Sequence, residues 1–322
     1  MLKDLLENKK IFKLVCGAGN EDAEEVEKLV ALYSMAGCNF FDLSAKPEIV
    51  DAAKRGLEFA GIKNDRYLCV SVGIQGDPHV SKAVIDSEKC KKCGRCYAVC
   101  PQKTIIEKDL HYKVNKTRCI GCLKCVEICP AKCIEMVSEF VDLKEVLPPL
   151  VAKEIDCVEF HTLGENEAEV DEKWAEINAC FSGVLSICID RSKLGNEKLL
   201  SRLKRMLKTR QDFTTIIQAD GCPMSGSEDD YKTTLQTVAA AEIVQNAKLP
   251  VYIMLSGGTN SKTTELASLC GIDFHGVAIG TFARKIVGKY ISRKDFLTNK
   301  IIFDEALKIA KNLVEKSMEK MG

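Results

Sequence analysis

Short apolar runs alternate with amphipathic segments along most of the chain. In the segments between the runs, apolar residues recur at spacings of three and four, which is typical of helices with one buried face. Apolar runs without strict alternation are typical of strands that are buried on both faces of a parallel sheet. The predicted strands are residues 12–16, 39–43, 67–72, 157–160, 184–189, 215–218, 251–255 and 276–279.

A helix is predicted after most of these strands, and the chain ends in one. The predicted helices are residues 24–35, 49–59, 143–153, 173–180, 198–208, 232–245, 263–270 and 303–319. Strands that alternate with helices in this way predict an α/β fold, a (β/α)8 TIM-type barrel. A doubly wound open sheet is the alternative that this pattern leaves open.

One segment, residues 77–140, interrupts the alternation. It contains two groups of cysteines and four short predicted strands, at residues 83–86, 105–107, 112–115 and 134–137. We therefore predict a barrel formed by residues 1–76 and 141–322, with an inserted α+β two-cluster ferredoxin domain after the third strand. Because the insert follows the carboxyl end of a strand, we expect it at the face where barrel active sites are built.

The cysteine spacing identifies the chemistry of the insert. Cys90 begins a C-x2-C-x2-C-x3-C-P run, and Cys119 begins an identical run 29 residues later. This repeat is the signature of a ferredoxin with two [4Fe–4S] clusters, in which the fourth cysteine of each run binds the other cluster. Zinc sites favour paired C-x2-C modules instead. The predicted ligands are Cys90, Cys93, Cys96 and Cys129 for cluster one, and Cys119, Cys122, Cys125 and Cys100 for cluster two.

Composition narrows the setting and the partners. The chain has 46 basic and 46 acidic residues, so a general attraction to nucleic acid or to an anionic membrane is not expected. Residues 1–8 have no apolar signal core, and no apolar run is long enough to span a bilayer. We therefore predict a cytoplasmic protein whose 17 cysteines serve metal binding and packing rather than disulfides.

Two loops after the last predicted strands resemble a phosphate site. Barrels often hold a ligand phosphate between these loops, with backbone amides and a helix N-terminus. FMN or another phosphorylated ligand is the predicted occupant, and a pair of tight turns is the alternative. The predicted binding residues are Ser256, Gly257, Gly258, Gly280, Thr281 and Arg284.

Polar residues at other strand ends are candidates for catalysis. His161, Asp220 and Cys222 follow the fourth and sixth predicted strands, and we predict that they serve the reacting group. Cys16 and Cys222 are candidates for redox chemistry or for a further metal, with simple packing as the alternative. The remaining cysteines outside the two runs are predicted to pack in the core: Cys38, Cys69, Cys133, Cys157, Cys180, Cys188 and Cys270.

Several short segments resemble the light-dependent period protein family of cyanobacteria. They are KLVCGA (residues 13–18), YSMAG (33–37), GDPH (76–79), QADGCPMSG (218–226) and LSGGTN (255–260). The resemblance implies an iron–sulfur protein that senses or relays cellular redox state, in cyanobacteria as an input to the circadian clock. It implies no particular reaction.

Three functions are consistent with these patterns. In the first, an oxidoreductase passes electrons through the two clusters to a cofactor or substrate at the barrel mouth. In the second, the protein is a redox-sensing adaptor without catalysis, as the resemblance implies. In the third, it is a simple electron carrier. The predicted partner is accordingly a redox protein or a small-molecule substrate.

Overall fold

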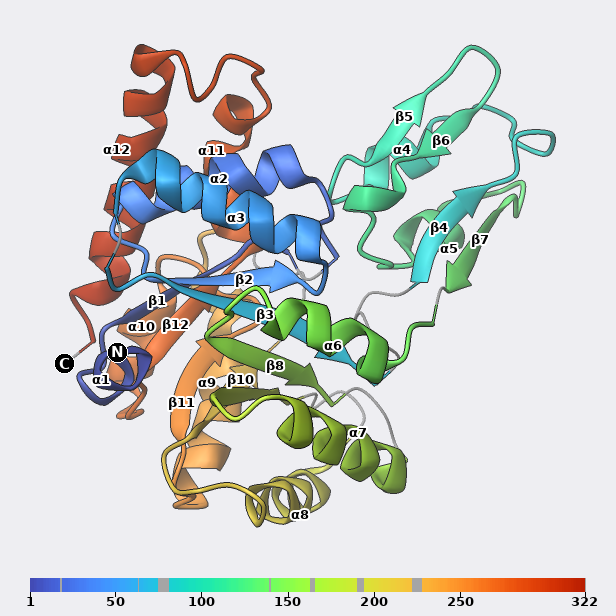
Figure 1. The fold of residues 1–322 in the computed structure, drawn as a ribbon. Helices are drawn as coiled ribbons and strands as arrows, with labels where there is room; N and C mark the ends of the chain where they lie inside the picture. Colours follow the sequence, from blue (N-terminus) through green and yellow to red (C-terminus); the bar gives the residue numbers. More distant parts are fainter. Residues whose placement is uncertain are drawn as a thin grey trace.

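The computed structural model describes residues 1–17, 19–62, 64–74, 81–138, 140–162, 166–189, 194–221 and 228–321. Its main body is a closed parallel barrel in which the strands adjoin in the order β1-β12-β11-β10-β9-β8-β3-β2 (Figure 1). The barrel prediction is confirmed, and the open-sheet alternative is excluded. The barrel strands are β1 (Ile11–Val15), β2 (Phe40–Ser44), β3 (Tyr67–Gly73), β8 (Cys157–His161), β9 (Val184–Cys188), β10 (Thr215–Asp220), β11 (Tyr252–Ser256) and β12 (Gly276–Ile279).

Side chains alternate between the barrel interior and the surrounding helices. On β8, Val158 and Phe160 belong to the core beneath the helices, whereas Cys157 belongs to the cluster inside the barrel. Glu159 and His161 alternate with Val158 and Phe160 and therefore share the inner face with Cys157. The polar strand ends that the sequence shows are thus directed into the barrel.

Helices surround the barrel, and most of them lie where the sequence predicts them. Two helices were not predicted: α1, which precedes the first strand, and α11, which follows β12. The helices of the barrel are α1 (Leu2–Glu7), α2 (Ala23–Met35), α3 (Pro47–Ala60), α6 (Leu143–Val151), α7 (Glu167–Cys180), α8 (Asn196–Leu207), α9 (Tyr231–Asn246), α10 (Thr263–Leu269), α11 (Thr281–Ile291) and α12 (Lys300–Met318).

Helix α1 closes the base of the barrel. Leu2 and Leu6 are buried, 5% and 0% exposed, against inward-facing residues such as Phe40 and Tyr252. The Tyr252 hydroxyl also donates to Glu7 Oε1 at 3.4 Å. The interior therefore opens at the other end, where the strands finish.

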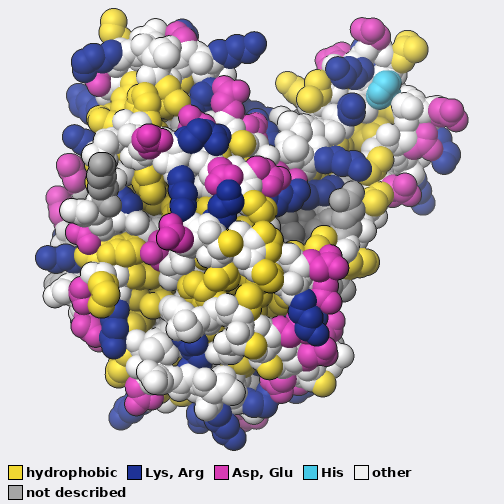
Figure 2. Space-filling model, viewed as in Figure 1, with side chains coloured by type: hydrophobic (Ala, Val, Ile, Leu, Met, Phe, Trp, Pro, Cys, Tyr) yellow, Lys and Arg dark blue, Asp and Glu magenta, His cyan; other side chains and the backbone are white. Residues whose placement is uncertain are grey.

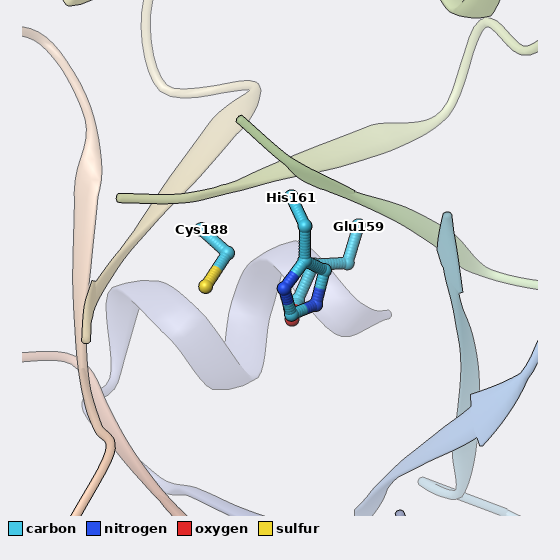
Figure 3. Close-up of side chains that lie close together, drawn as sticks. All are labelled: Glu159, His161 and Cys188. Carbon is cyan, nitrogen blue, oxygen red and sulfur yellow. The ribbon is translucent and has the colours of Figure 1, made fainter. Parts of the chain in front are cut away.

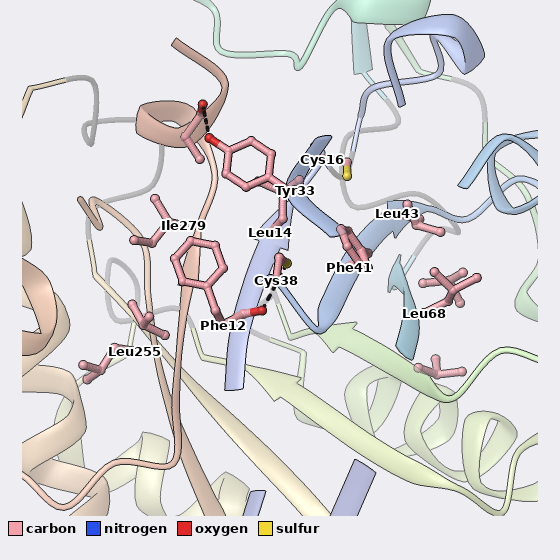
Figure 4. Packing of buried hydrophobic residues seen from close by; sticks show 14 of the residues in the cluster. Phe12, Leu14, Cys16, Tyr33, Cys38, Phe41, Leu43, Leu68, Leu255 and Ile279 are labelled. Atoms are coloured by element: carbon pink, nitrogen blue, oxygen red, sulfur yellow. Dashed lines mark hydrogen bonds between the residues drawn. The ribbon is translucent and has the colours of Figure 1, made fainter. Parts of the chain in front are cut away.

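The outer core lies between the strands and the helices. Figure 4 shows Phe12 and Leu14 of β1 beside Phe41 of β2 and Tyr33 of α2. The Tyr33 hydroxyl donates to the carbonyl of Ala283 at 2.7 Å, which ties α2 to α11. A buried hydroxyl of this kind needs a partner, so this contact orients α11 relative to α2.

The insert forms a separate module that adjoins one side of the barrel (Figure 1). Its strands form two antiparallel pairs, β4 with β7 and β5 with β6. The predicted boundary after residue 76 falls in residues 75–80, outside the described part of the chain. The elements of the module are β4 (Ser81–Ile85), α4 (Arg95–Val99), β5 (Ile105–Glu107), β6 (Tyr112–Val114), η1 (Lys116–Arg118), α5 (Lys124–Ile128) and β7 (Ile134–Ser138).

In the described part of the chain, every helix is too short or too polar to cross a membrane.

Candidate functional site at the barrel mouth

The first cysteine cavity of the module gathers the ligands predicted for cluster one. Its lining includes Cys90, Cys93 and Cys96 from the first run and Cys129 from the second. Cys133, which was predicted to pack, lies beside them, with its Sγ 3.5 Å from Sγ of Cys129. The described cysteines are all free thiols, so these groups are available as ligands.

The second cysteine cavity gathers the ligands predicted for cluster two. Its lining includes Cys119, Cys122 and Cys125 from the second run and Cys100 from the first. In both cavities, three thiols come from one loop and the fourth from the other run, as a crossed two-cluster arrangement requires. The residues present therefore fit two [4Fe–4S] clusters.

Both cluster loops contain left-handed residues that direct the loop around its cavity. Gly94 and Leu123 are the N-caps of α4 and α5, with φ angles of 76° and 63°. Two residues earlier, Lys92 has a φ of 48° and Gly121 a φ of 67°. The repeat in sequence is thus a repeat in backbone conformation, with glycine at a different position in each loop.

The second cluster loop is fixed to the barrel by polar contacts. Lys82 Nζ donates to the carbonyl of Cys119 at 2.9 Å and to that of Gly19, after β1, at 3.3 Å. Arg118 forms an ion pair of 2.5 Å with Glu25 of α2. These contacts hold the loop that carries three of the predicted cluster-two ligands against the open end of the barrel.

The open end of the barrel contains one cavity that gathers almost all predicted site residues. His161 and Asp220 line it, as do the six residues of the predicted phosphate site. Ile120 of the second cluster loop lines it as well, so the module forms part of its wall. Cys222, the third catalytic candidate, lies outside the described residues. The six loop residues are Ser256, Gly257, Gly258, Gly280, Thr281 and Arg284.

The loop after β12 presents a helix N-terminus to this cavity. Helix α11 begins at Thr281, and its N-cap, Gly280, supplies no side-chain hydrogen bond. The first backbone amides of such a helix lack internal partners and favour an anion. Arg284 is oriented by donation from its Nη1 to the Val15 carbonyl at 2.6 Å. Burial lowers the Arg284 pKa, and the carboxylate of Glu25 opposes that effect.

A buried charged network lies directly below the cavity. Lys13 Nζ is 2.6 Å from Glu159 Oε2 and 3.7 Å from Asp42 Oδ1. Burial acts to raise the pKa of Glu159, but Lys13 and His161 outweigh it and hold that pKa at about 2. Burial raises the Asp42 pKa, which Lys13 only partly opposes. Glu159 is therefore the anionic centre of the network.

His161 lines the cavity beside Asp42 and Glu159 of this network. Its Nε2 lies 3.2 Å from Glu159 Oε1, although it makes no well-aligned hydrogen bond there. Burial acts to lower the His161 pKa, and Glu159 raises it above the ordinary value instead. Lys13 was not predicted as a site residue, because a lysine within an apolar strand does not identify its partners, whereas Glu159 is one of the polar strand ends that were considered for chemistry.

Of two further cysteines outside the runs, Cys16 agrees with the packing alternative and Cys188 departs from its prediction. Cys16, a candidate for redox chemistry or metal binding, is fully buried in the apolar core, and burial raises its pKa well above the ordinary value. Cys188 was predicted to pack, yet it lines the cavity, with its Sγ 3.6 Å from Asp220 Oδ2. Because Cys188 ends strand β9, its place at a strand end was the feature of the sequence that could have identified it as a cavity residue.

These features define a class: iron–sulfur proteins with a two-cluster ferredoxin module inserted in a (β/α)8 barrel. The family model of the 4Fe-4S dicluster domain matches residues 82–130, and that of the light dependent period A C-terminal domain matches residues 149–316. "Light dependent period A" of Synechococcus elongatus is 31% identical over 259 residues, which is 78% of this chain and 72% of the relative. The chain belongs to the light dependent period A family, as its motifs indicate.

A solved structure shares the fold over nearly the whole chain. The YdjI aldolase of Escherichia coli K12 has a TM-score of 0.50 at 7% identity, covering 99% of this chain and 94% of the aldolase. A truncated 3-deoxy-D-arabino-heptulosonate 7-phosphate synthase of Thermotoga maritima has a TM-score of 0.49 at 10% identity, covering 96% and 86%. At such low identity the likeness concerns the fold alone, because barrels support many chemistries.

Proposed function

We propose that this protein is a redox protein that exchanges electrons between its two [4Fe–4S] clusters and a small anionic ligand in the barrel-mouth cavity. Bound to the eight cysteines, the clusters would supply one-electron transfer. The proposal rests mainly on the position of Ile120, which lies between Cys119 and Gly121 in the second cluster loop. Ile120 lines the same cavity as His161 and Asp220. The cluster-two cavity and the ligand cavity thus share a wall.

The contacts of the module support a fixed distance between these two sites. Lys82 and Arg118 connect the module to the loop after β1 and to α2. The backbone N–H of Glu21 also donates to the carbonyl of Thr117 at 2.6 Å. Bonds that come from both main chain and side chains limit how far the loop can move from the cavity.

The proposed ligand is an anion, with a phosphate group as the favoured chemistry. The uncapped N-terminus of α11 offers backbone donors, and Gly257 and Gly258, both at positive φ, line the same cavity from the loop after β11. The guanidinium of Arg284 adds a positive group to the same wall. FMN is one phosphorylated candidate, although the matches reported above name no flavin.

His161 and Asp220 are proposed to contact the reacting part of the ligand. Both line the cavity, on the ends of β8 and β10, and Asp220 pairs in register with Ser256 of the first phosphate loop. His161 is 16% exposed and is backed by Glu159, so a proton on its ring is stabilised. Cys222, the third residue predicted to serve the reacting group, remains a prediction.

A redox-sensing adaptor is the second proposed function, and the exposed surface of the module favours it. Leu110 is 83% exposed, Phe140 65% and Tyr97 56%. Figure 2 shows hydrophobic side chains on the part of the module that extends away from the barrel. Exposed apolar groups near an electron carrier are suited to docking a partner protein.

Purification without oxygen tests the proposal. We expect about eight irons and eight sulfides per chain, together with a phosphorylated compound released by acid. Thr281→Glu, which places a carboxylate at the N-terminus of α11, should abolish that compound and keep the iron. Full iron content with no released compound, and with cluster EPR spectra unaffected by added phosphate or pyrophosphate, would contradict the cavity ligand and favour the adaptor.

A further inference from the structure

Three donor groups of different chemistry meet at the inner end of the cavity. A carboxylate oxygen of Glu159, a ring nitrogen of His161 and the sulfur of Cys188 lie within 4.8 Å of one another. Figure 3 shows the imidazole of His161 in front of the side chain of Glu159, with the thiol of Cys188 to one side. The strand register explains the meeting, because His161 of β8 pairs with Cys188 of β9. Thiolate, imidazole and carboxylate are the donors that zinc takes in proteins.

The buried side-chain amide of Gln218, on the next strand, also indicates a bound cation at this level of the barrel. Gln218 of β10 pairs with Cys188 in the strand register and lines the cavity. This residue is only 2% exposed, yet its side-chain Oε1 has no hydrogen-bond partner among the described residues. A buried carbonyl oxygen without a donor is rare and calls for an explanation. A cation beside the Gln218 oxygen would supply that explanation.

The charges around the donors also favour a cation. The pKa of His161 is raised by three carboxylates, those of Glu159, Asp42 and Asp220. Lys13 forms an ion pair with the first of them. Burial lowers the pKa of Arg284, which lines the cavity, and among nearby charges Glu25 opposes that effect most. The carboxylates that act on His161 thus outnumber Lys13, and this setting favours a bound cation.

We propose that Glu159, His161 and Cys188 bind one divalent transition-metal ion, zinc by the chemistry of its donors, with Asp220 as the fourth donor. Asp220 Oδ2 lies 3.6 Å from the Cys188 sulfur, a normal separation for two ligands of one ion. Donors around a tetrahedral zinc lie about 3.3–3.8 Å apart, given bonds of about 2.0–2.3 Å. Glu159, His161 and Cys188 lie within 4.8 Å of one another, so the widest of their three separations would have to shorten by about 1 Å. The site rests on these donors alone and does not require the proposed electron exchange.

Metal analysis of the whole protein tests this site. The protein is purified without oxygen from zinc-supplemented medium and desalted, and its zinc, iron and sulfide are then counted. We expect about one zinc per chain in addition to the cluster iron. X-ray absorption at the zinc edge should show one sulfur at about 2.3 Å, with nitrogen and oxygen as the other ligands.

Two variants and a control separate the site from other zinc. Cys188→Ser should lower the zinc content at least about tenfold and leave iron and sulfide unchanged, and His161→Ala should do the same. Cys180→Ser, at the end of α7, is the matched control and should keep the zinc. Three results would overturn the proposal: no zinc in the parent protein, zinc retained in Cys188→Ser, or zinc bound by four sulfurs, which would place it in a cluster site.

Discussion

The two cluster loops have nearly the same backbone and face different surroundings. At equivalent positions, Lys92 and Gly121 both have positive φ, as do Gly94 and Leu123. Lys91, in the first loop, is exposed, whereas its counterpart Ile120 is 9% exposed and lines the barrel cavity. Lysine and leucine thus occupy left-handed positions that the other loop fills with glycine. The backbone serves the cluster, and the side chains distinguish a loop that faces solvent from one that faces the barrel.

The largest expected effect tests whether the loops exchange their fourth cysteines. Cys93→Ser and Cys129→Ser lie in different runs but border the same cavity. Each should remove the same cluster, with a loss of about four irons and of the same EPR signal. Cys122→Ser should remove the other signal. If Cys129→Ser and Cys122→Ser abolished the same signal, each run would bind its own cluster.

The two glycines should differ sharply in their tolerance of a side chain. A Cβ at Gly121 would lie 2.6 Å from the carbonyl oxygen of Ser81, whereas one at Gly94 would lie 3.5 Å from the Tyr112 hydroxyl. Gly121→Ala should cost about 3 kcal/mol, from the backbone clash and the left-handed strain, and Gly94→Ala about 1 kcal/mol. Urea unfolding of the iron-loaded proteins, at matched iron content, measures both. Equal shifts would mean that packing against β4 is unimportant.

Exchanging the residue that distinguishes the loops should give a smaller, one-sided effect. Ile120→Lys places an ammonium in the wall between the module and the barrel and should cost about 2 kcal/mol. Lys91→Ile, the matched change at the exposed position, should cost less than about 0.5 kcal/mol. Limited proteolysis between the module and the barrel, together with urea midpoints, would report the difference. Similar protection in both variants would show that Ile120 does not hold the loop.

The smallest effect concerns the ion pair between the module and α2. Arg118 is about one-third exposed, so Arg118→Ala should cost about 0.5 kcal/mol and less at high salt. Burial raises the Glu25 pKa and Arg118 opposes this, so the variant should raise it further. A carboxyl whose folded-state pKa is raised destabilises the fold as pH rises through that pKa. The loss should therefore be largest near neutral pH and disappear in acid. A loss that grew on acidification would contradict this.

The barrel could be predicted because its information is local and repeated. Each strand is an apolar run and most helices have a clear apolar face, so the eight strands fall where the pattern places them. Helix α1 was missed because LKDLLE is too short to show periodicity. Helix α11 was missed because its start, Gly280 to Arg284, was interpreted only as a phosphate loop, and Gly288 interrupts its pattern.

The sequence predicted the site residues that lie at strand ends, but it did not predict which residues of different strands contact each other. His161, Asp220 and the phosphate loops line one cavity because carboxyl ends of parallel strands converge in a barrel. Which inward residues pair with each other depends on register, which the sequence does not show. Lys13 with Glu159, and His161 with Cys188, are such pairs. The contact of Ile120 with the barrel depends on how the module docks, so it too required the structure.

The closed base of the barrel affects how the buried charged groups exchange protons with solvent. With Leu2 and Leu6 sealing one end, the described side chains leave Lys13, Glu159 and Asp42 in a dead-end chamber. Asp42 and Glu159 line the cavity at the mouth together with His161. The protonation state of these groups should therefore change only from the mouth. A ligand that fills the cavity would then separate them from the protons of the solvent.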